Sequence, residues 1–97
     1  MPANAAALDR LNETIQQRKA AAPAGSYTAS LLAKGPAECA KKVGEEAIEV
    51  VQASALQQDD RIIYESADLL YHLLVLLAAH NIAPDAVYAE LERRMKP

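Results

Sequence analysis

Two short acidic pairs on either side of one turn constrain this chain more than any other feature of its sequence. They are Glu46-Ala-Ile-Glu49 and Glu65-Ser-Ala-Asp68. Residues three apart are neighbours on one face of an α-helix, so each pair would present two carboxylates side by side. A turn is predicted between them, near residues 57–60. If two helices fold back there, a rise of about 1.5 Å per residue places both pairs about 14 Å from the turn, at the same height.

Four carboxylates at one level of a helix pair repel one another strongly unless a cation lies among them. Each carboxylate taken alone is more simply part of a solvated helix face, but the matched pairs beside an apolar surface favour a divalent-metal site. The acidic segments contain no cysteine and no Glu-x-x-His step. Hard oxygen ligands of this kind favour Mg²⁺ over zinc or a di-iron centre. The expected metal ligands are Glu46, Glu49, Glu65 and Asp68.

Magnesium bound by a few carboxylates is commonly completed by the phosphates of a substrate. The sequence has no P-loop, so a helix-borne metal site would have to hold those phosphates. The expected chemistry is therefore cleavage of a phosphoanhydride, in which a carboxylate orients or deprotonates the attacking water.

Residue usage predicts an all-α fold. The chain has 97 residues, 52% of them hydrophobic, and three glycines. Many of the apolar residues are Ala and Leu, which are strong helix formers. We expect one domain over residues 1–97, with residues 1–7 frayed, built as an antiparallel bundle of four to five helices. So large an apolar share on so short a chain suggests that part of it is buried between subunits.

Helix boundaries follow from apolar spacing and from Pro, Gly and capping residues. Ser26 is the expected N-cap of the second helix and Asp59 a possible cap of the fourth. His80 is expected to cap the fourth helix at its C-terminal end. The predicted helices span residues 4–20, 26–34, 36–56 and 60–80, with a last one starting at Pro84.

The third and fourth helices carry the acidic groups beside their apolar faces. On the third helix one predicted stripe contains Val43, Ala47, Val50, Val51 and Ser54, and a separate arc holds Lys42, Glu45, Glu46 and Glu49. On the fourth helix, Glu65, Asp68 and His72 fall within an arc of about 60° of an otherwise apolar helix. A helix so apolar is usually central in its fold or shared by two subunits.

Several further side chains are candidates for supporting roles. Lys34, Lys41 and Lys42 could contact phosphate, and Lys42 is the best placed because it lies one turn from Glu46; an ordinary ion pair with Glu46 is the alternative. His72 could hydrogen-bond Asp68 from outside the metal's ligands, or be a satisfied core histidine. Tyr64 and Tyr71 are expected to be packing residues.

Charge and cysteine usage exclude some function classes. The net charge of −3 argues against a general nucleic-acid binder. Cys39 is the only cysteine and is expected to be a buried thiol. With no signal peptide recognised, the expected location is the cytoplasm. The run from Leu69 to Ala79 is too short to span a bilayer, so no membrane partner is expected.

These residues also carry a resemblance. The acidic pattern Glu45-Glu46-Ala-Ile-Glu49 followed by Glu65-Ser-Ala-Asp68 is similar to the metal motif of the all-α NTP pyrophosphohydrolase (MazG-like) superfamily. Three longer strings, in order over about residues 8–94, resemble its phosphoribosyl-ATP pyrophosphohydrolase family. They are Ser26-Tyr27-Thr28, Lys41-Lys42-Val43-Gly44-Glu45-Glu46 and Glu65-Ser-Ala-Asp68-Leu-Leu-Tyr71-His72-Leu-Leu.

The resemblance implies a Mg²⁺-dependent hydrolysis of 1-(5-phosphoribosyl)-ATP to 1-(5-phosphoribosyl)-AMP and pyrophosphate, the second step of histidine biosynthesis. It also implies a helical homodimer. By the motif, Glu46, Glu49, Glu65 and Asp68 would ligate the metal, and Glu45 would be a further ligand or position water.

Two other functions stay open at this point. A housecleaning dNTP pyrophosphatase would use the same metal site on a different nucleotide. A non-catalytic helical dimer could instead use its acidic stripe to bind a basic partner, in which case charge would matter and metal would not.

Overall fold

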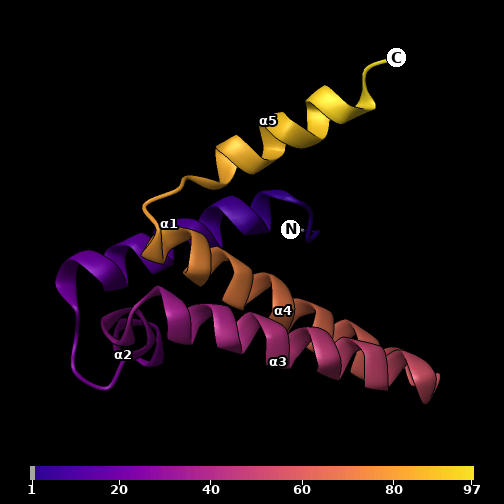
Figure 1. Cartoon of the computed structure of the whole chain (residues 1–97), viewed down its shortest axis with the longest axis horizontal. Coiled ribbons are helices and arrows are strands. Elements are labelled where there is room, and N and C mark those ends of the chain that lie inside the picture. Colours follow the sequence, from indigo (N-terminus) through magenta and orange to yellow (C-terminus); the bar gives the residue numbers. More distant parts are fainter. Residues whose placement is uncertain (1) are drawn as a thin grey trace.

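The computed structural model describes residues 2–97, and within them the chain forms five α-helices and no strand (Figure 1). This confirms the all-α prediction. The helices are α1 (Ala6–Ala21), α2 (Tyr27–Lys34), α3 (Pro36–Ala55), α4 (Asp59–Ala79) and α5 (Pro84–Met95).

Several helices begin and end at the residues that the sequence predicts. Ser26 caps α2, because its Oγ accepts a hydrogen bond from the backbone N–H of Ala29 at 3.1 Å. Gly35, at φ 92°, separates α2 from α3 in a left-handed conformation that glycine adopts without strain. Pro36 and Pro84 each stand at the start of a helix, where a missing N–H costs nothing. His80 is the C-cap residue of α4, as expected.

Three predictions about helix ends and packing need correction. Asp59 is not a cap but the first residue of α4, where its charge suits the positive end of the helix dipole; Gln58 is the N-cap and makes no side-chain cap bond. The first helix begins at Ala6, because the Asn4 side chain accepts a hydrogen bond from the Ala6 N–H. This start lies within residues 1–7, the stretch that was expected to fray. Met1, the first residue of that stretch, lies outside the residues that the structure describes. Tyr64 is exposed and packs against nothing in the core, whereas Tyr71 does pack against it.

The long helices α3 and α4 lie side by side and antiparallel, and α1 packs against α2 and α4 (Figure 1). Their reversal takes place at Gln57, whose φ is 55°. The core forms where α1, α2 and the start of α3 meet the second half of α4. It consists of Ile15, Leu31, Cys39, Leu74, Val75 and Ala78. The buried Cys39 confirms the expected packing role of that thiol.

Beyond this core, α3 is covered only on the side that faces α4. Ala53 is buried there, but the predicted core residues Val51 and Ser54 are exposed. The prediction was wrong at these positions because no third helix within residues 2–97 covers the far half of α3. Val43, Ala47 and Val50 are half-buried.

The last helix, α5, extends away from the bundle (Figure 1). Between it and α4 lies a groove, the α4–α5 groove, lined by Leu8, Leu70, Leu73, Leu74, Leu77, Pro84, Val87, Tyr88 and Leu91. Helix α4 is long and apolar enough to cross a membrane by length and composition alone. It also carries buried Glu65 and His72 and packs along α3, so here it is the central helix of the bundle.

Candidate metal centre

Three carboxylates from the two long helices converge on one point. Glu46 comes from α3 and Glu65 and Asp68 from α4, and each offers an oxygen that lies within 4.8 Å of the other two. Glu65 is 5% exposed, and the other two residues are half-buried. The predicted juxtaposition across the helix pair is therefore present for three of the four residues. We call Glu46, Glu65 and Asp68 the carboxylate cluster.

The electrostatics of the carboxylate cluster are unfavourable without a cation. Burial raises the pKa of Glu46, and the charges of Asp68 and Glu65 raise it further, while His72 and Lys42 act in the opposite direction. The exposed Arg61 guanidinium lies 3.5 Å from a Glu65 oxygen and offsets part of the charge. A divalent ion among these oxygens would relieve the remaining repulsion.

Glu49 and Glu45 lie at the edge of this arrangement. Glu49 is exposed and is not part of the carboxylate cluster, although it follows Glu46 by one turn of α3. Glu45 is also exposed and accepts a hydrogen bond from Lys42 Nζ at 3.1 Å. The ion pair of Lys42 is thus made with Glu45, three residues on, and not with Glu46 as considered from the sequence.

The three candidate lysines differ in position. Lys42 is half-buried on the same side of α3 as the carboxylate cluster and influences the pKa of both Glu46 and Tyr27. Lys34 ends α2 and Lys41 precedes Lys42, and both are exposed. Among residues 2–97, neither of these two lysines forms an ion pair with the cluster.

His72 contacts Asp68 in a different way from the one expected. Its Nδ1 lies 2.8 Å from the backbone carbonyl oxygen of Asp68, not from the carboxylate, because residues four apart on a helix bring that carbonyl next to the ring. Its Nε2 lies 3.1 Å from the hydroxyl oxygen of Tyr27. His72 therefore fixes the α4 backbone at Asp68 and links it to α2.

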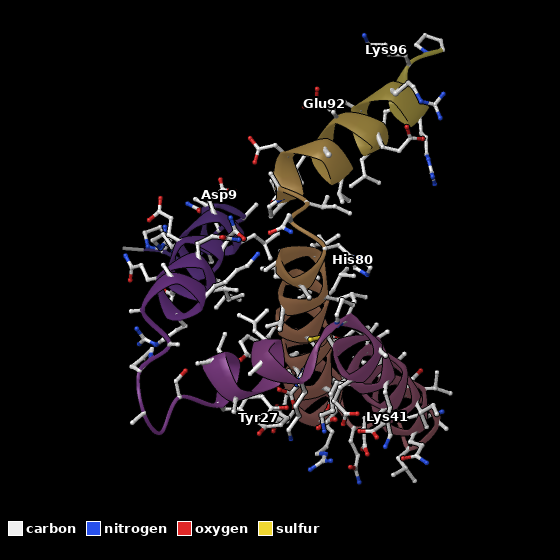
Figure 2. The ribbon with its side chains drawn as sticks, turned by 60° about the vertical axis from the view of Figure 1, so that its left-hand side comes forward. Asp9, Tyr27, Lys41, His80, Glu92 and Lys96 are labelled. Atoms are coloured by element: carbon white, nitrogen blue, oxygen red, sulfur yellow. The ribbon has the colours of Figure 1, made fainter. Side chains whose placement is uncertain are left out.

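Tyr27 belongs to the string Ser26-Tyr27-Thr28, and residue spacing alone indicates no role for it. It is the first residue of α2 and 52% exposed. Its pKa is raised by burial of the hydroxyl and by the charges of Glu46 and Asp68, and lowered by Lys42. Its hydroxyl is linked through His72 to the α4 backbone at Asp68, a residue of the carboxylate cluster. Figure 2 shows Tyr27 and Lys41 on the lower side of the bundle, away from His80.

The fold and the carboxylate cluster agree with a comparison against known families. A model of the phosphoribosyl-ATP pyrophosphohydrolase family matches residues 8–95. The chain belongs to this family. The matched range is nearly the one over which the sequence motifs indicated a resemblance.

Individual relatives of the phosphoribosyl-ATP pyrophosphohydrolase family agree. The phosphoribosyl-ATP pyrophosphatase of Parvibaculum lavamentivorans is 57% identical over 94 residues, covering 97% of this chain and 86% of that protein. The protein of the same name from Trichlorobacter lovleyi is also 57% identical, over 97% of this chain and 87% of its own length. The one from Saccharolobus islandicus is 49% identical over 92% of this chain and 95% of its own. The family is one of hydrolases, so an enzyme rather than a non-catalytic binding module is confirmed.

Proposed function

We propose that this chain hydrolyses 1-(5-phosphoribosyl)-ATP to 1-(5-phosphoribosyl)-AMP and pyrophosphate, as a step of histidine biosynthesis in the cytoplasm, and that the reaction depends on Mg²⁺. Membership of the family and the names of the relatives support the substrate. The carboxylate cluster carries the metal assignment.

The residues of the cluster fit a hard divalent cation. All three ligand groups are carboxylates, and their oxygens lie within 4.8 Å of one another. The pKa of Glu46 is raised by burial first and then by the charges of Asp68 and Glu65. A bound Mg²⁺ would supply charge neutralisation of the phosphate oxygens of the substrate. Glu46, Glu65 and Asp68 would hold it, and Glu49 would join as a fourth ligand after a change of side-chain rotamer.

The neighbouring charged groups would serve the substrate and water. Glu45, held by Lys42, would position or deprotonate the attacking water, with Glu46 as the second catalytic carboxylate. When the substrate binds, the Lys42 ammonium would contact a phosphate oxygen. Lys34 and Lys41 are proposed as additional, weaker phosphate contacts from exposed positions.

A second copy of the chain is the proposed occupant of the α4–α5 groove. Exposed apolar residues of α4 line up along one stripe, with Ile63, Leu70 and Leu73 36–69% exposed. By 100° per residue this stripe lies on the side of α4 opposite to Glu65 and Asp68. A homodimer formed there would bury the apolar stripe and leave the carboxylate cluster open to substrate.

Release of pyrophosphate tests the proposed function. The wild-type protein should release it from phosphoribosyl-ATP with Mg²⁺ and stop when a chelator is added. A panel of dNTPs, assayed beside it, should be cleaved far more slowly. Preference for a dNTP would make the chain a housecleaning pyrophosphatase instead. Activity that survives the chelator would remove the metal from the proposal.

A further inference from the structure

One hydrogen-bonded chain joins the α4 backbone at Asp68, a residue of the carboxylate cluster, to Tyr27 at the start of α2. The Asp68 carbonyl oxygen, the His72 ring and the Tyr27 hydroxyl are joined by contacts of 2.8 Å and 3.1 Å. The Tyr27 and His72 rings meet edge to face, with centroids 6.0 Å apart. Residues that are 45 positions apart in sequence are thereby held in one fixed arrangement.

The direction of each hydrogen bond in this chain follows from chemistry. A carbonyl oxygen can only accept, so His72 Nδ1 carries the proton and donates it to Asp68. In the neutral ring, Nε2 then has only a lone pair. His72 is 5% exposed, and a buried acceptor left without a donor is costly, so the Tyr27 hydroxyl donates to Nε2.

This direction limits what Tyr27 can recognise. With its proton committed to His72, the Tyr27 oxygen offers only lone pairs to anything beyond it. Phosphate oxygens of a nucleotide at neutral pH also lack protons to donate. The nearest donors on a nucleotide whose phosphates lie at the carboxylate cluster are the hydroxyls of the adjoining ribose. Tyr27 is 52% exposed as a whole residue, and its hydroxyl is part-buried against His72, so solvent reaches one side of the side chain.

We propose that Tyr27, oriented by His72, accepts a hydrogen bond from a ribose hydroxyl of the substrate and makes the enzyme select ribonucleotides over deoxyribonucleotides. This inference rests on the proposed function and extends it to the basis of sugar selectivity. Tyr27 is the specificity residue, and His72 is a positioning residue that acts through it.

The adjacent tyrosine provides a matched control. Tyr71 lies with its ring centroid 6.4 Å from that of Tyr27, but its hydroxyl is paired with Thr28 Oγ1. Removing the Tyr71 hydroxyl changes the same aromatic cluster without touching the contact to His72.

The test compares kcat/KM for phosphoribosyl-ATP with kcat/KM for its 2′-deoxyadenosine and 3′-deoxyadenosine counterparts. Wild-type enzyme should prefer the ribose form over at least one counterpart by about tenfold, the equivalent of one good hydrogen bond. Tyr27→Phe should bring that ratio close to one, mainly by losing activity on the ribose form. Tyr71→Phe should keep the wild-type ratio.

The ratio is the readout because general damage to the site lowers activity on every substrate alike. His72→Leu, checked for helicity by circular dichroism, should reduce the ratio as Tyr27→Phe does; if it does not fold, Tyr27→Phe decides the matter alone. A wild-type ratio that Tyr27→Phe leaves unchanged, with phosphoribosyl-ATP still cleaved, would overturn this inference and leave the proposed function intact. Preference of the wild type for dNTPs would overturn both.

Discussion

Glu46 occupies an unfavourable position for a charged carboxylate. Burial raises the pKa of its carboxyl, and Asp68 and Glu65 face it from the neighbouring helix. Glu49, one turn along the same helix, is exposed and outside the carboxylate cluster. The two residues are chemically identical and separated by a single turn, so they form a natural pair for comparison.

Glu46→Gln should lower kcat/KM for phosphoribosyl-ATP by about 10²-fold or more. The substitution keeps the shape of the side chain but removes the charge of a metal ligand. A bound metal stabilises the transition state by several kcal/mol, and each loss of about 1.4 kcal/mol lowers the rate tenfold. Glu49→Gln should have a smaller effect, seen mainly as a higher Mg²⁺ concentration for half-maximal rate. Pyrophosphate release over a Mg²⁺ series measures both. Equal losses of kcat/KM in the two variants would mean that Glu49 is a full metal ligand. Full activity of Glu46→Gln would rule out the carboxylate cluster as the metal site.

The stabilisation of the folded protein by Mg²⁺ should increase as the pH rises. The folded-state pKa of Glu46 lies above its ordinary value of 4.5, so the folded protein binds this proton more tightly than the unfolded chain does. The contribution of this group to stability is complete below the ordinary value and is lost as pH rises through the raised value. Mg²⁺ binds the deprotonated form and restores that stability.

The rise in melting temperature on adding Mg²⁺ should therefore be larger at about pH 7 than at about pH 5. Thermal unfolding followed by circular dichroism measures it, with Glu46→Gln as the control that should show little difference between the two pH values. A rise in melting temperature that is equal at the two pH values would contradict the assignment of Glu46 as a metal ligand.

Residue spacing predicted part of this site and missed the rest. Glu65, Asp68 and Glu46 could be placed together because helix periodicity and the height above the turn are properties of the sequence. Exclusion of Glu49 depends on how α3 is rotated against α4, which spacing does not fix. The contact of Tyr27 with His72 joins distant segments, and its only sequence signal was that both lie in motif strings.

At the scale of elements, α2 is short and depends on its cap. Its eight residues bring Tyr27 into contact with His72, one turn from Asp68, and Ser26 satisfies an N–H that the helix itself leaves free. The sequence predicted this cap and the ends at Gly35 and Pro36 because such signals are local. It did not predict that the far half of α3 stays uncovered, since that depends on where α1 and α2 pack.

Ser26→Ala should destabilise the fold by about 1 kcal/mol, the usual cost of losing an N-cap. Because Tyr27 is the next residue, kcat/KM for phosphoribosyl-ATP should fall as well. Urea unfolding at a fixed protein concentration and pyrophosphate release measure the two effects. Ser30→Ala, which alters an exposed serine of the same helix, should change stability less. Equal unfolding midpoints for Ser26→Ala and wild type would show that the cap does not hold α2.

The whole molecule shows an acidic face and an apolar face on opposite sides of α4. The apolar stripe continues into the α4–α5 groove, and α5 itself projects from the bundle (Figure 1). The proposed second copy of the chain would cover these exposed leucines.

Leu73→Glu should convert a dimer into monomers, because it places a charge in the centre of the proposed interface. Leu73 is 36% exposed in the single chain, so the monomer itself should tolerate the change. Analytical ultracentrifugation measures the mass. A substitution of exposed Ala89 to Glu on α5 is the control for added charge on the surface. Wild-type protein that sediments as a monomer would rule out the proposed dimer.

Binding of a divalent ion tests most directly the claim on which the proposed function depends. Mn²⁺ can stand in for Mg²⁺ and be followed by electron paramagnetic resonance. Wild-type protein and Asp60→Asn, which alters an exposed acid at the start of α4, should bind Mn²⁺ alike. Asp68→Asn should bind it at least about tenfold more weakly, since a ligand charge is lost from the carboxylate cluster. Equal binding by Asp68→Asn and the wild type would contradict the account.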